Sequence, residues 1–213
     1  MLELINTLAQ AYAEQFSSPE EPALQQIAED TYNSHPHAHM LSGHAQGQFL
    51  QLISQVAKPH KILEIGAFVG YSAIYLAKGL QPGGELHTIE LREEDAATAR
   101  ANFNKANLQD KIILHVGNAL EIIPTLEHEW DIVFIDADKV GYSAYYKLVL
   151  PRVKKGGLII ADNVLFHGEV LEAAIKGKNA KAIHAFNEMV RQDASVDKVM
   201  LTLRDGLLLI LKK

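Results

Sequence analysis

The sequence predicts an α/β protein in which a doubly wound, mostly parallel sheet of seven strands ends in an antiparallel hairpin and follows a group of N-terminal helices. Three observations predict this architecture. From Lys61 onward, apolar runs of strand length alternate with amphipathic stretches of helix length. The last two strand-like runs meet at Asp205-Gly206, a dipeptide typical of tight hairpin turns. The segment before Lys61 has helical periodicity instead.

Helices are expected before the sheet near Glu3–Phe16, Pro22–Tyr32 and His44–Val56. The connection NSHPHAHMLSG between the last two is rich in His, Gly and Pro, which predicts a flexible or functional loop. We expect one domain over residues 1–213, with N-terminal helices and a lid in 1–57 and an α/β core in 58–213, because a chain of this length supports a single stable core.

The elements of the core follow from the alternating pattern. Five apolar runs fit parallel strands at Lys61–Ile65, Glu85–Glu90, Lys111–Val116, Asp131–Asp136 and Gly157–Asp162. Helices are expected between them at about Ser72–Gly79, Glu93–Ala106, Ala119–Leu126 and Gly141–Leu150. The final pair of strands is expected within Ser195–Asp205 and Gly206–Lys213. Ligands of such sheets bind outside the carboxyl ends of the strands, so these ends are where a functional site is expected.

Composition limits the possible functions. Hydrophobic residues make up 48% and charged residues 22%, as in an ordinary globular protein. The absence of cysteine excludes disulfides, zinc–thiolate sites and a thiol nucleophile, and it suits a reducing compartment. A net charge of −6 gives no basic surface for nucleic acid. The N-terminus lacks the pattern of a signal peptide, and no apolar stretch is long enough to span a membrane, so we expect a cytoplasmic protein.

The ends of the first three strands favour a ligand with cationic, hydroxyl and flat parts. Gly66 and Gly70 allow a tight turn before a helix N-terminus, although this G-x-x-x-G spacing fits an ordinary strand-to-helix turn equally well. Glu64 lies in an otherwise apolar strand, where an unpaired carboxylate would be costly, so a cationic ligand group would explain it. Glu90 suits two ribose hydroxyls, with a surface glutamate as the simpler alternative. Ala119 is small enough to lie against a flat ring.

The fourth and fifth strands end in oxygen ligands. Asp136, Asp162 and Asn163 follow apolar runs at neighbouring edges of the predicted sheet, and two carboxylates with an amide suit Mg²⁺, Mn²⁺ or Ca²⁺. The alternative is that the aspartates cap a turn and a helix. Lys139 could take a proton from a ligand hydroxyl, or be a solvated lysine that opens a helix. Asp138 has no assigned role.

The histidines of the N-terminal loop have a weaker pattern. His35, His37 and His39 alternate, which would allow a second metal site on one side of an extended segment. Pro36 interrupts the run and no fourth ligand is evident, which favours ordinary polar loop residues.

From about Met40 to the C-terminus the sequence resembles the cation-dependent S-adenosylmethionine O-methyltransferases, the group of catechol and caffeoyl-CoA O-methyltransferases, and in particular their small bacterial members. The matching segments are HMLSGHAQGQFL, ILEIGAFVGYSA, HTIELREE, DIVFIDADKVGY, GGLIIADNVLFHGEV and LRDGLLL. DADK followed by ADN is specific to this group, whereas the glycine motif occurs in most methyltransferases. The resemblance implies a Rossmann-like fold and a homodimer.

The resemblance also implies roles for individual residues. S-adenosylmethionine would contact Met40, Ser42 and Ser72 at its methionine end, Glu64 and the Gly66-Ala67 backbone through its amino acid portion, Glu90 through its ribose, Ala119 beside its adenine, and Asp136. Magnesium would bind Asp136, Asp162 and Asn163, and Lys139 would be the general base, so that Lys139 and Asp136 are the expected catalytic residues.

The expected function is therefore metal-dependent methylation of a catechol-like or hydroxylated phenolic small molecule. Residues 1–57 contain neither Lys nor Arg, and this disfavours the CoA thioesters that plant relatives bind with N-terminal basic residues. Two alternatives stay open. Methylation of a hydroxylated uridine in tRNA is disfavoured by the acidic balance, and a module that binds the cofactor without catalysis is disfavoured by the intact metal and base residues.

Overall fold

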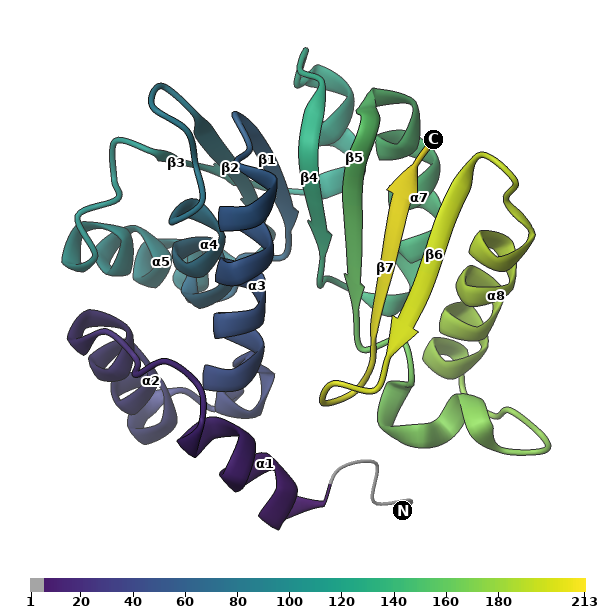
Figure 1. The fold of residues 1–213 in the computed structure, drawn as a ribbon, viewed down its shortest axis with the longest axis horizontal. Coiled ribbons are helices and arrows are strands. Elements are labelled where there is room, and N and C mark those ends of the chain that lie inside the picture. Colours follow the sequence, from purple (N-terminus) through teal and green to yellow (C-terminus); the bar gives the residue numbers. More distant parts are fainter. Residues whose placement is uncertain (1–5) are drawn as a thin grey trace.

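The computed structural model describes residues 6–213 and contains one seven-stranded sheet with the strand order β3-β2-β1-β4-β5-β7-β6 (Figure 1). The strands are β1 Lys61–Ile65, β2 Glu85–Glu90, β3 Ile112–Val116, β4 Trp130–Ile135, β5 Val153–Asp162, β6 Val196–Leu201 and β7 Leu207–Lys212. Strands β1 to β5 pair in parallel, and β7 pairs antiparallel with both β5 and β6. The predicted doubly wound sheet with an antiparallel C-terminal pair is confirmed.

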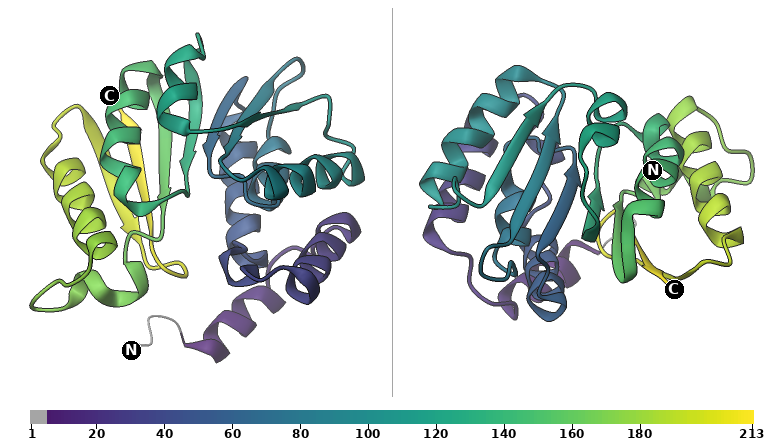
Figure 2. Two further views of the ribbon diagram at one scale, coloured as in Figure 1. Left: turned by 180° about the vertical axis from the view of Figure 1, so that it is seen from behind. Right: turned by 90° about the horizontal axis from the view of Figure 1, so that it is seen from above.

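Helices cover both faces of the sheet (Figure 2). The α-helices are α1 Thr7–Gln15, α2 Pro22–Ser34, α3 His44–Ala57, α4 Tyr71–Ala77, α5 Glu93–Lys105, α6 Ala119–Ile122, α7 Tyr142–Val149 and α8 Lys178–Gln192. The short 3₁₀ helices are η1 Ala38–Met40, η2 Ile123–Thr125, η3 Lys139–Gly141, η4 Leu150–Arg152 and η5 Phe166–Leu171. Alternate side chains of each central strand enter opposite cores, so that Val133 packs with α7 and α8 while Phe134 packs with α2 to α5.

The structure differs from the sequence prediction in several bounds. Helix α8 was not predicted, although its buried residues Ala180, Ile183, Phe186 and Val190 have helical spacing. The helix expected at Ala119–Leu126 is α6 followed by η2, because Pro124 cannot donate the next helical hydrogen bond. The hairpin connection spans residues 202–206 and is longer than a two-residue turn. The predicted start of the first helix at Glu3 lies outside the described residues.

The N-terminal helices lie toward the edge of the sheet at which the parallel strands end (Figure 1). Helix α3 packs tightly on α4, since a Cβ on Gly47 would lie 2.3 Å from the Tyr75 ring, and the Ser54 hydroxyl donates to the Leu76 carbonyl over 2.6 Å. The Arg204 guanidinium of the β6–β7 hairpin donates to the Leu41 carbonyl over 2.9 Å. Residues 6–57 are therefore tied to both halves of the core. No helix among the described residues is long and apolar enough to cross a membrane.

Candidate active site

The turn after β1 is pressed between the ends of β2 and β4. Gly66 has φ +100°, and a Cβ there would lie 2.0 Å from the Asp136 carbonyl oxygen, so only glycine allows this close approach. The backbone N–H groups of Gly66 and Ala67 donate to the Ile89 carbonyl over 2.9 and 3.1 Å. The turn thus fixes the end of β4 relative to its neighbours.

Glu64 is completely buried at the end of β1, as its position in an apolar strand predicts. Its carboxylate accepts hydrogen bonds from the Ser72 hydroxyl over 2.6 Å and the Thr88 hydroxyl over 2.5 Å. Burial raises the pKa of Glu64 to about 8, more than the two hydroxyl donors lower it. A positive group brought to this carboxylate would favour its ionised form.

Glu90 is buried at the end of β2, which rules out the alternative of a surface glutamate. One of its oxygens accepts from the Phe68 N–H over 2.7 Å and the other from the Arg92 N–H over 2.9 Å. These two backbone donors fix the carboxylate at the mouth of the β1–α4 turn. The other predicted cofactor contacts lie at the start of α6, where Ala119 is buried, and in the segment before α3, where Ser42 is buried and Met40 is exposed.

The ends of β4 and β5 bring the three predicted metal ligands together around one lysine. Lys139 Nζ, at the start of η3, lies 3.0 Å from Asp136 Oδ1 and 2.9 Å from Asn163 Oδ1. Asp162 is the last residue of β5, directly before Asn163, and it is buried. Asp136 and Lys139 are partly buried, so their charges are screened less than those of a fully exposed ion pair.

Asp162 is the most constrained of the three. Its Oδ2 accepts from Gln46 Nε2 over 2.5 Å and its Oδ1 accepts from the Asn163 N–H over 2.6 Å. Burial, followed by the negative charge of Asp136, raises the pKa of Asp162 to about 7. The buried Asp162 and the partly buried Asp136, whose negative charges repel each other, form with the Asn163 amide oxygen a donor set that fits a hard divalent cation. Among residues 6–213 there is no group of three His, Cys, Asp or Glu suited to a metal, so the amide is needed to complete this set.

Comparison with known proteins gives the family. The family model described as "O-methyltransferase" matches residues 14–213. The chain belongs to the O-methyltransferase family. A protein of Niastella koreensis named catechol O-methyltransferase is 37% identical over 160 residues, which cover 73% of this chain and 72% of the relative. A probable caffeoyl-CoA O-methyltransferase 1 of Dictyostelium discoideum is 36% identical over 179 residues, covering 81% of this chain and 78% of the relative.

The solved structures agree with this assignment. An O-methyltransferase from Bacillus cereus, crystallised in complex with SAH, superposes with a TM-score of 0.90 at 32% identity and covers 97% of this chain and 98% of its own. The resemblance inferred from the DADK and ADN motifs is thereby confirmed. The protein is an O-methyltransferase, an enzyme class that takes its methyl group from S-adenosylmethionine.

Three residues of this O-methyltransferase site were missed in the sequence. Gln46 of α3 donates to Asp162, and the hydroxyl of Tyr142, at the start of α7, lies 2.7 Å from Lys139 Nζ. Asp205 of the β6–β7 hairpin faces the Asn163 amide, with 3.4 Å between Asp205 Oδ2 and Asn163 Nδ2. The available signals were the short segments HAQGQFL, DADKVGY and LRDGLLL, each of which contains one of these residues.

Asp138, which had no assigned role, caps η3. It accepts from the Gly141 N–H over 2.9 Å and from the Tyr145 hydroxyl. These contacts hold the backbone that begins at Lys139, so Asp138 shapes the methyltransferase site by fixing the turn that carries the lysine.

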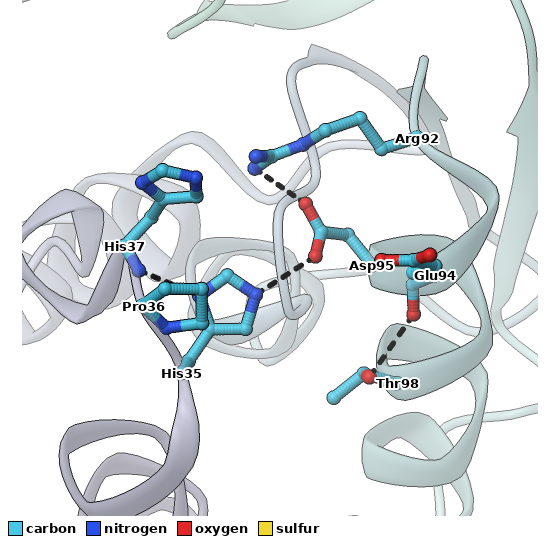
Figure 3. Close-up of a pocket in the computed structure, with 7 residues that line it drawn as sticks. All are labelled: His35, Pro36, His37, Arg92, Glu94, Asp95 and Thr98. Carbon is cyan, nitrogen blue, oxygen red and sulfur yellow. Dashed lines mark hydrogen bonds and ion pairs between the residues drawn. The ribbon is translucent and has the colours of Figure 1, made fainter.

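The first histidine of the N-terminal loop is paired with an acidic residue of α5. His35 Nε2 lies 3.0 Å from Asp95 Oδ1, and the His37 N–H donates to His35 Nδ1 over 3.1 Å (Figure 3). Asp95 also pairs with Arg92, and these residues line a cavity of about 250 Å³ between the loop and the start of α5. His35 thereby fastens the loop to α5, and among residues 6–213 no group of three His, Cys, Asp or Glu is arranged to hold a metal.

Proposed function

We propose that this O-methyltransferase transfers the methyl group of S-adenosylmethionine to one hydroxyl of a catechol-like or hydroxylated phenolic small molecule. Asp136, Asp162 and Asn163 would hold a divalent metal, magnesium in the first place with manganese or calcium as alternatives. The observation that carries the proposal is that these three oxygen donors follow one another at the ends of two neighbouring parallel strands, where Lys139 bridges Asp136 and Asn163 and the adjacent Asp162 is buried. The names of the relatives, catechol and caffeoyl-CoA O-methyltransferase, support the same substrate class.

Lys139 is the proposed general base. In the reaction a bond forms between the acceptor oxygen and the methyl carbon, the bond from that carbon to the sulfonium sulfur breaks, and the acceptor hydroxyl loses its proton. Lys139 Nζ contacts two of the predicted ligands and would take this proton. A bound divalent ion supplies Lewis acidity that brings the pKa of a phenol, ordinarily near 10, toward neutrality. The rigid ends of β4 and β5 then contribute by holding the acceptor in line with the methyl group.

Cofactor binding is proposed along the ends of β1, β2 and β3. Glu64 and Ser72 would receive the methionine end together with Met40 and Ser42, Glu90 the ribose, and Ala119 the adenine. Because an ammonium group only donates hydrogen bonds, the Gly66-Ala67 backbone would bind the cofactor's ammonium through carbonyl oxygens, while its N–H groups donate to Ile89.

The direct test follows methyl transfer from labelled S-adenosylmethionine to a panel of catechol, caffeate and singly hydroxylated phenols. We expect activity with the vicinal diols, loss of activity in chelator, and recovery on addition of magnesium. Asp136→Ala should abolish turnover while the fold is retained by circular dichroism. Full activity in chelator, or turnover that survives Asp136→Ala, would rule out the metal mechanism.

The assembly and location are proposed as well. The resemblance favours a homodimer, and α1 exposes Leu8, Tyr12 and Phe16 at helical spacing while it buries no residue of its own. Residues 6–57 would act as the lid of a cytoplasmic enzyme. Light scattering should give the mass of a dimer, and a monomeric mass at micromolar concentration would contradict this assignment.

A further inference from the structure

Tyr142 has a hydroxyl whose hydrogen-bonding geometry is completely specified. The side chain is buried, and its oxygen lies 3.2 Å from the Ile135 carbonyl and 2.9 Å from the Asp162 carbonyl, at the ends of β4 and β5. Carbonyl oxygens only accept hydrogen bonds, so the single phenolic proton is directed to this pair. The lone pairs of the hydroxyl are therefore available to Lys139 Nζ, which lies 2.7 Å away.

Lys139 has three acceptors, and they differ in kind. Asp136 Oδ1 at 3.0 Å and Asn163 Oδ1 at 2.9 Å belong to proposed metal ligands. An ammonium group and a divalent cation cannot share these two oxygens at contact distance, because the like charges repel strongly in a shielded site. The Tyr142 hydroxyl is the one of the three acceptors that does not belong to the proposed ligand set.

We propose that Tyr142 is the positioning residue for Lys139: its hydroxyl keeps the lysine amine beside the site when a metal takes the Asp136 and Asn163 oxygens. This inference rests on the proposed function. The hydrogen bond from Lys139 Nζ to the Tyr142 hydroxyl holds this nitrogen next to the proposed ligands, where an acceptor hydroxyl would lie. Without the tyrosine hydroxyl, the lysine has only the metal's oxygens to bind and competes with the metal for them.

A double-mutant cycle on metal affinity tests this directly. Mn²⁺ binding, measured by the paramagnetic resonance signal of the free ion, is compared in the wild type, Tyr142→Phe, Lys139→Met and the double variant. We expect Tyr142→Phe to weaken Mn²⁺ binding by about tenfold, the range for one hydrogen bond to a charged group. In the Lys139→Met background the same change should alter affinity by less than about twofold, since no lysine is left to compete.

Tyr146→Phe is the matched control. Tyr146 lies one turn further along α7, is equally buried, and gives its hydroxyl to Asp193 Oδ2 over 2.9 Å. This variant removes the same atom from the same helix and should leave Mn²⁺ affinity within about twofold of the wild type. With a catechol acceptor, Tyr142→Phe should lower kcat by about tenfold or more with KM unchanged, because a misplaced base affects the chemical step.

The outcomes separate the two proposals. Equal weakening of Mn²⁺ binding by Tyr142→Phe in both backgrounds would mean that the tyrosine merely supports the strand ends, and this would overturn its positioning role while the metal site stands. A rise in KM with kcat unchanged would also overturn it. Absence of Mn²⁺ binding by the wild-type protein would overturn the metal site and the positioning role together, and it would be visible before any variant is made.

Discussion

Gly66→Ala should be much more destabilising than an ordinary substitution at a left-handed glycine. Gly66 has φ +100°, so alanine there incurs the backbone cost of about 1–2 kcal/mol that L-residues show in this region. The new Cβ would also lie 2.0 Å from the Asp136 carbonyl oxygen, and this backbone atom cannot rotate away. Overpacking of a rigid contact costs roughly a further 1–3 kcal/mol. The sum is about 2–5 kcal/mol, a large part of the stability of a domain.

Gly83→Ala isolates the two contributions. Gly83 also has positive φ, at +76°, but a Cβ there would have no heavy atom within 4 Å. The Gly83→Ala variant should lose only the backbone contribution, about 1–2 kcal/mol of unfolding free energy, which lowers Tm by roughly 2–8 °C for a chain of this size. Thermal and urea unfolding of both variants measure the difference. Equal losses of stability in the two variants would refute the close approach of the β1–α4 turn to β4.

Three further predictions concern titration and capping. Because the folded-state pKa of Glu64 is raised from 4.5 to about 8, the stability that its protonated form contributes is complete below pH 4.5 and is lost as pH rises toward 8. Glu64→Gln should therefore flatten this part of the pH–stability curve of the cofactor-free enzyme. An unchanged slope would refute the raised pKa. Burial, then the neighbouring histidines, lower the pKa of His87 from 6.5 to about 4. The stability that neutral His87 contributes is therefore complete above pH 6.5 and is lost as pH falls toward 4. Fluorescence of Trp130, whose ring centroid lies 5.5 Å from that of His87, should follow this loss, and His87→Gln should shift the pH at which it occurs. Asp138→Ala removes the cap of η3 and should lower the free energy of unfolding by about 1 kcal/mol, while the ranking of the acceptors by activity stays the same. A changed ranking would instead place Asp138 in contact with the substrate.

The parallel core could be predicted from the sequence because buried strands have simple patterns. The runs KILEI and ELHTIE give the bounds of β1 and β2 to the residue, since each has apolar or β-branched residues at its centre and a turn or helix signal on either side. Helix α8 carried an equally usable signal in the spacing of Ile183, Phe186 and Val190.

The convergence of Asp136, Asp162 and Asn163 was predictable for a topological reason. Neighbouring parallel strands end at the same edge of a sheet, and β4 and β5 are neighbours, so polar residues just after both must meet. The partners of these ligands were not predictable in this way. Gln46 is 116 residues from Asp162 in the sequence, and Asp205 is 42 residues from Asn163. Such contacts depend on how α3 and the β6–β7 hairpin pack on the ends of the strands, which no local sequence pattern specifies.

The candidate ligands are held by three separate parts of the chain, and this arrangement has a functional consequence. Helix α3 supplies Gln46 to Asp162, the C-terminal hairpin supplies Asp205 to Asn163, and η3 supplies Lys139 to Asp136. Arg204 of the hairpin donates to the Leu41 carbonyl, just before α3, so these two parts are coupled to each other as well as to the candidate ligands. A displacement of α3 would therefore change the hydrogen bond that Gln46 donates to Asp162. Since a buried carboxylate that loses a donor becomes a more avid partner for a cation, we expect the packing of α3 and the affinity of the proposed metal site to be energetically linked.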